Sequence, residues 1–193
     1  AVIFGGDVGS GTRLGALSIV SADDVTANAN ITAASFNQTD GTGTTDLNGA
    51  VDTDTAAGVT ITNETITVDN TITTTGTGVV TLNADTMTLT FTAPGDIISD
   101  GAVSLTAAGG ITTAGDVTTT DDDVTYVSAT TLSGPVSIST GAGGAGNINF
   151  SSTLNGTQNL TLLAGTGNIT FTGVVGGTTP LDDVTITSAA NVT

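Results

Sequence analysis

Residues 59–91 read VTITNETITVDNTITTTGTGVVTLNADTMTLTF, and this stretch decides the fold. Apolar residues alternate with Thr in short runs, such as Val59 to Ile61, Ile66 to Val68 and Val80 to Leu82. Alternation with a period of two places one side of a run in a core and the other in water, which predicts β-strands. Gly, Asn and Asp separate the runs, and these residues favour turns.

The same pattern recurs along the chain, with runs beginning at 59, 80, 103, 124, 136, 160 and 184. Most steps are similar in length, whereas the step from 124 to 136 is much shorter and interrupts the series. Each run is too short to bury its apolar row alone, whereas stacked turns bury it together. The sequence therefore predicts an all-β fold, a right-handed parallel β-helix (β-solenoid) with about eight or nine rungs of roughly 21–24 residues.

Two further structural expectations follow from the same pattern. Residues 37–57 are the most polar stretch, and we expect a loop-rich corner there. Phe36, Phe91, Phe150 and Phe171 fall on inward positions of the runs and are expected to form an aromatic ladder between nearby rungs. The whole chain, residues 1–193, is predicted to form one solenoid segment.

The composition excludes several classes of function. The chain has 193 residues with a net charge of −17, Arg13 is its only basic residue, and it has no His, Cys or Trp. Metal sites built on imidazole or thiolate and His-dependent nucleophilic catalysis therefore lack their residues. The charge repels nucleic acid and anionic membranes, so neither is an expected partner, and no apolar run is long enough for a membrane-spanning helix.

The acidic residues suggest two kinds of site. Asp121, Asp122 and Asp123, with Asp182 and Asp183, are weak candidates for Ca²⁺ ligands, because Ca²⁺ prefers several oxygen ligands. Aspartate is equally suited to solvated turns at rung corners. Paired carboxylates also occur in glycoside hydrolases, but the cationic and aromatic groups that hold a sugar are nearly absent here. We predict no enzyme activity and no cofactor, with Ca²⁺ as the one open alternative.

Thr-x-Thr arrays such as Thr86 to Thr92 raise a different possibility. A flat face of Thr could order water, as ice-binding solenoids do. Thr is also simply a soluble β-branched residue that suits the outward side of a strand. The irregular rung length favours this second interpretation.

A longer internal repeat links the two ends of the chain. Residues 171–193 align with residues 4–26 without a gap at an offset of 167, with 11 identities in 23 positions. The sequence thus predicts one period of a longer repeat array. Neither end resembles a polar cap, which a solenoid needs to close its core.

These ends are the predicted interaction sites. We expect them to be covered by copies of the chain or by covalently linked neighbouring repeats, stacked head to tail. The predicted interface residues are Val2, Phe4 and Val8 at one end and Val184, Ile186 and Val192 at the other.

Phrases such as Gly167-Asn168-Ile169-Thr170-Phe171-Thr172-Gly173 and Val184-Thr185-Ile186-Thr187-Ser188-Ala189 resemble the repeats of very large bacterial surface proteins. These are the filamentous-haemagglutinin-like and β-strand-repeat exoproteins and adhesins, and the likeness covers nearly all of the chain. It implies a right-handed β-helix, export to the cell surface, and a structural or adhesive role. The resulting hypothesis is a structural segment of an extracellular filament or surface fibre; the alternative is an adhesin rod that binds carbohydrate or a host protein through a lateral face.

Overall fold

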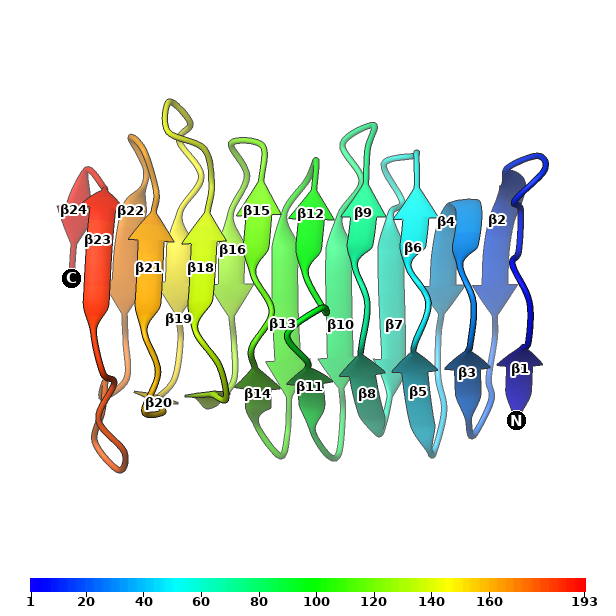
Figure 1. The fold of residues 1–193 in the computed structure, drawn as a ribbon, viewed down its shortest axis with the longest axis horizontal. Coiled ribbons are helices and arrows are strands. Elements are labelled where there is room, and N and C mark those ends of the chain that lie inside the picture. The colour runs from blue at the N-terminus through cyan, green and yellow to red at the C-terminus, as the bar shows by residue number, and fades with distance from the viewer.

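The computed structural model describes residues 1–193 and shows a parallel β-solenoid of about nine turns without helices. Most turns, or rungs, hold three short strands, and every strand of an internal rung pairs in parallel with its equivalents in the rungs before and after. Stacking places equivalent strands side by side along the axis, as Figure 1 shows. At the usual spacing of strands, the nine rungs extend about 38 Å from first to last. The predicted fold class is confirmed.

Three columns of strands form the faces of the coil. The first column is the 8-stranded sheet, which contains β1 (Val2–Phe4), β3 (Val25–Ala27), β5 (Thr44–Leu47), β8 (Thr65–Val68), β11 (Leu89–Phe91), β14 (Ile111–Thr113), β17 (Thr130–Leu132) and β20 (Leu154–Asn155).

The second and third columns are joined into one 16-stranded sheet by the long strand β4 (Ile31–Gln38), whose two halves belong to one column each. The second column continues with β6 (Val51–Thr53), β9 (Ile72–Thr74), β12 (Ile97–Ser99), β15 (Val117–Thr119), β18 (Val136–Ser139), β21 (Leu160–Leu163) and β23 (Val184–Ser188). The third column has β2 (Leu14–Ile19) before β4, and then β7 (Val59–Asn63), β10 (Val80–Ala84), β13 (Val103–Ala107), β16 (Val124–Tyr126), β19 (Ile148–Phe150), β22 (Asn168–Phe171) and β24 (Asn191–Val192).

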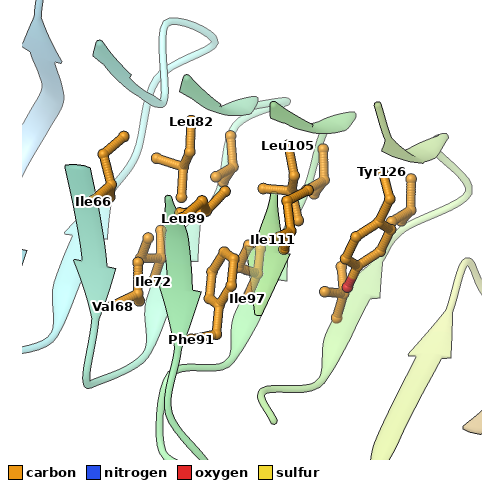
Figure 2. Packing of buried hydrophobic residues seen from close by; sticks show 14 of the residues in the cluster. Ile66, Val68, Ile72, Leu82, Leu89, Phe91, Ile97, Leu105, Ile111 and Tyr126 are labelled. Atoms are coloured by element: carbon orange, nitrogen blue, oxygen red, sulfur yellow. The ribbon is translucent and has the colours of Figure 1, made fainter. Parts of the chain in front are cut away.

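The core is a set of aliphatic rows that run along the axis. Leu82, Leu105 and Tyr126 follow one another in the third column, and Ile66 and Leu89 do so in the first (Figure 2). The core cluster has 36 buried residues, nearly all of them fully inaccessible. Because each row continues through every rung, an internal rung is covered on both sides, and only the first and last rungs lack a neighbour on one side.

The aromatic ladder is shorter than expected and lies at one end. Tyr126 stacks on Phe150 with ring centroids 4.9 Å apart, and Phe150 stacks on Phe171 at 5.4 Å. Phe36 and Phe91 lie in other rows, where their strand neighbours are aliphatic residues or Thr, so they were wrongly assigned to the ladder.

Two other expectations are corrected by the strand register. The short step from 124 to 136 arises because 124 begins a third-column strand and 136 a second-column strand of the next rung, so the coil itself is not interrupted. Residues 37–57 are not a loop-rich corner, since they contain β5 and β6. Some of their polar side chains point into the core. Thr45 and Thr53 are fully buried, and the Thr45 hydroxyl donates to Gln38 Oε1 at 2.7 Å.

Candidate functional site: the two open end rungs

The N-terminal end rung consists of β1, the single bridge at Val8, and β2. These strands pair on one side only, with β3 and β4, and Val8 bridges to Ile31. Four apolar side chains of this rung are partly buried and pack against the N-terminal end of the core, namely Val2, Phe4, Val8 and Leu17. The N-terminal end therefore presents apolar side chains beside unpaired strand edges.

The C-terminal end rung consists of the bridge at Val175, β23 and β24. These elements also pair on one side only, with β20, β21 and β22. Ile186 is 38% exposed and Val192 50% exposed, whereas Leu162 and Ile169 beneath them are at 0%. The exposed parts of both side chains lie where one more rung would cover them.

The two end rungs are in phase with each other. Eight register steps lead from Val2 to Val175 in the first column. Eight steps also lead from Val8 to Ile186 in the second column. The same number leads from Leu17 to Val192 in the third. All three rows thus run uninterrupted from one end to the other.

A polar ladder on the surface runs in the same direction and reaches the C-terminal end. The backbone N–H of Asn147 donates to Asp123 Oδ1 at 2.6 Å, and that of Asn168 donates to Asn147 Oδ1 at 2.9 Å. In the last rung, Asn191 Nδ2 donates to Asn168 Oδ1 at 2.8 Å. At each step a side-chain oxygen accepts a hydrogen bond from the following rung, and Asn191 is the last residue of this ladder.

The single basic residue, Arg13, binds neighbouring rungs at the N-terminal end. Arg13 lies just before β2, and its Nη2 and Nε atoms lie 2.9 and 3.0 Å from carboxylate oxygens of Asp52 and Asp54. Its Nη1 atom donates to the carbonyl oxygens of Ala33 and Asp52. This residue, to which the sequence alone assigned no role, therefore links the first rung to the second and third.

The structure places all six predicted interface residues in or beside the end rungs. Val2, Phe4 and Val8 lie at the N-terminal end, and Val184, Ile186 and Val192 at the C-terminal end. Leu17 and Val175 occupy the same end rungs and were missed. Leu17 lies in an alternating run that could have been recognised, whereas Val175 is an isolated bridge without a flanking pattern.

The candidate calcium ligands do not come together. Asp121 to Asp123 lie between β15 and β16, and Asp182 and Asp183 precede β23, three rungs away. No group of three or more acidic side chains in the chain converges closely enough to hold a metal ion. Calcium binding stays a prediction, which a Ca²⁺ titration of thermal stability would test.

The acidic turn nevertheless has an electrostatic consequence. Partial burial raises the pKa of the Asp122 carboxyl, and the neighbouring charges of Asp100, Asp123 and Asp121 raise it further. Burial also raises the pKa of Tyr126, with a smaller contribution from Asp116, because its phenol lies fully inside the core. The Asp122 carboxylate is repelled by its acidic neighbours, and the Tyr126 ring packs in the core. Neither side chain borders an enclosed cavity. The one hollow on the surface is a shallow site lined by Asp116, Pro135 and Asn159 among others.

The lateral faces are polar. Of the eleven large apolar residues that are exposed, Met87, Ile98 and Val127 lie on internal rungs. The other eight lie in or directly beside the end rungs, namely Ile3, Leu14, Val20, Val174, Val175, Val184, Ile186 and Val192. No Phe or Tyr is among them.

No family model, curated protein or solved structure matches this chain. The likeness to filamentous-haemagglutinin-like repeats accordingly stays a prediction from the sequence. The chain forms no helix that is long and apolar enough to cross a membrane.

Proposed function

We propose that this chain is a structural segment of an extracellular filament or surface fibre, extended end to end by stacking of β-rungs. The observation that carries the proposal is the distribution of exposed apolar side chains, eight of eleven at the two end rungs. Those that continue core rows beside unpaired strand edges, such as Ile186 and Val192, favour continuation of the sheet, because another rung would satisfy the backbone and cover these rows at once.

The charge distribution supports the same function. With 18 acidic residues and one basic residue, rods repel one another along their sides. Most aspartates lie in the turns, whereas the end rows are aliphatic. Association along the axis is therefore less opposed by charge than association side by side.

The adhesin alternative receives less support. A rod that binds a host protein through its side would be expected to expose an aromatic or apolar strip there. On the internal rungs, the sides carry three separate apolar residues and rows of Thr, Ser and Asn, such as Thr60, Thr81 and Ser104.

Electron microscopy and sedimentation of the concentrated protein test the proposal. We expect unbranched rods as wide as one coil, whose length increases with protein concentration, or a continuous rod where repeats are linked in one chain. Strictly monomeric particles at high concentration, together with breaks between linked repeats, would contradict it.

A further inference from the structure

Two segments with similar sequences adopt the same local structure on different faces of the coil. Residues 4–26 and 171–193 are the two copies of the internal repeat. The equivalent residues Val8 and Val175 form the two isolated β-bridges of the chain, with Ile31 and Leu154. The glycines that follow them, Gly9 and Gly176, both have positive φ, 75° and 69°, a backbone region that favours glycine.

Each residue of the segment 171–193 lies in the column that precedes the column of its equivalent in residues 4–26. Phe4 lies in the first column and its equivalent Phe171 in the third. Val8 bridges into the second column and Val175 into the first. Leu17 to Ile19 pair in the third column, whereas their equivalents, Val184 to Ile186, pair in the second.

The position of Val175 in its rung explains this shift. Eight complete turns lead to Val175 from Val2, which lies in the same first column. The repeat equivalent of Val175 is instead Val8, which follows Val2 in the same rung but lies one column further on. The repeat therefore ends one face short of eight turns.

On the basis of the proposed function, and for repeat units linked in one chain, we infer that the partner of the C-terminal end rung is a segment equivalent to residues 27–47 of the following unit, docked one face out of phase. Residues 4–26 already show the pairing: Val8 meets Ile31, Leu17 meets Phe36, and Val25 meets Thr45. By equivalence, Val175, Val184 and Val192 meet Ile31, Phe36 and Thr45 of the following unit.

The polar ladder fits the same partner. Asp24 Oδ1 accepts the backbone N–H of Thr44 at 3.1 Å. The equivalent of Asp24 is Asn191, the last member of the ladder, whose Nδ2 donates back to Asn168 and whose Oδ1 has no donor within the chain. A following unit would supply its Thr44 N–H to this oxygen.

The junction differs from the N-terminal end in one contact. Pro180 occupies the position equivalent to Arg13, so a following unit's Asp52 and Asp54 would lack their guanidinium partner. The backbone pairing and the aliphatic rows are retained, because they do not depend on this residue.

With this junction, equivalent side chains of successive repeat units would rotate around the axis of a rod. Each repeat unit advances the coil by about seven and two-thirds turns, roughly 37 Å at the usual strand spacing. Equivalent side chains then appear on successive faces, about a third of a turn apart, and return to the same face after three units. Lateral features such as the loop at Gly141 to Gly146 would thus be presented on all sides.

A tandem protein tests this register. Residues 1–193 are followed directly by residues 27–193 and again by residues 27–193, which keeps the phase of the internal repeat across both junctions. Cryo-electron microscopy is expected to show one continuous rod in which the loop at Gly141 to Gly146 recurs with a rotation of about a third of a turn. A continuous rod in which this loop recurs on one side would overturn the inference and leave the proposed function intact.

A matched control joins residues 1–193 to a complete second copy of residues 1–193. The second Val2 is then the third residue after Val192. Within the chain, the path from the third column to the first is longer, since even one of its shortest connections places Leu154 as the sixth residue after Ile148. We expect a gap or disorder at this junction. Breaks in the phased tandem as well would overturn both the inference and the proposed function.

Discussion

Replacing Ile186 by Asp tests the role of the C-terminal end rung. Ile186 lies in β23 above Leu162 and remains 38% exposed, so the isolated chain tolerates a change there better than at any internal rung. Thr185→Asp is the matched control, because it adds the same charge on the same strand but at a position that alternates to the outer side.

The magnitude follows from what stacking would bury. Covering the exposed part of Ile186 is worth about 1 kcal/mol, since full burial of such a side chain contributes about 1.5–3 kcal/mol. An unpaired carboxylate at the junction costs several kcal/mol more. The two effects together, about 4 kcal/mol, correspond to roughly a thousandfold weaker end-to-end association.

Sedimentation velocity over a range of concentrations measures this effect, and electron microscopy records rod length. Ile186→Asp should give short or single particles at concentrations where the native chain and Thr185→Asp form rods. The melting temperature of the isolated chain should change little by comparison. Rods of native length from Ile186→Asp, or equal loss from both variants, would refute the reasoning.

Three further predictions concern stability and are measured by thermal or denaturant unfolding. Phe150→Ala should destabilise the chain by about 3–5 kcal/mol, because it removes both the buried volume and the stacking on two aromatic rings, and Phe150→Leu should cost less but still measurably, because it keeps apolar volume and loses the stacking; no measurable loss from Phe150→Leu would argue against a contribution from stacking. Arg13→Gln should cost about 1 kcal/mol or less per ion pair, with the loss shrinking at high salt; insensitivity to salt would show that the ion pairs contribute nothing. Asp122→Asn should raise the melting temperature at pH 7. The raised pKa means that the folded state binds this proton more tightly than the unfolded state, so stability falls as pH rises through the folded pKa, and the variant's gain should vanish in acid. A gain that persists below pH 3 would have another cause.

The sequence predicted the strands in which aliphatic residues hold most of the inward positions. In β7 and β10, the inward positions are occupied by residues such as Val59, Ile61 and Leu82, and the period of two is visible without a structure. The residues of the end rungs were predictable for the same reason, since they continue the core rows.

The second-column strand of a rung was harder to recognise where Thr or Ser occupies an inward position. In β9, Thr74 is buried and its hydroxyl donates to the Gly78 carbonyl oxygen. In β12, Ser99 is buried and donates to the Gly101 carbonyl oxygen. A short strand followed by a tight corner can bury a hydroxyl, because the corner supplies a carbonyl acceptor, and this removes the hydrophobic signal.

The face shift between the two repeated segments was also beyond sequence reasoning. The offset between the segments matches a whole number of turns only if every turn is equally long. The turns differ in length, since the turn from Ile111 to Thr130 is shorter than the next one, from Thr130 to Leu154. Only the register of each strand pair reveals the accumulated difference.

Amide hydrogen exchange tests the central claim most directly, by comparing the isolated chain with the assembled or tandem rod. We expect amides in β23 and β24 to exchange rapidly in the isolated chain and to become protected at each junction of the tandem rod; where separate chains stack end to end, β1 and β2 become protected as well. Protection in the central strands β7, β10 and β13 should stay the same, because their neighbours do not change. Unchanged exchange in the end strands, with new protection along the sides of the coil, would contradict end-to-end stacking.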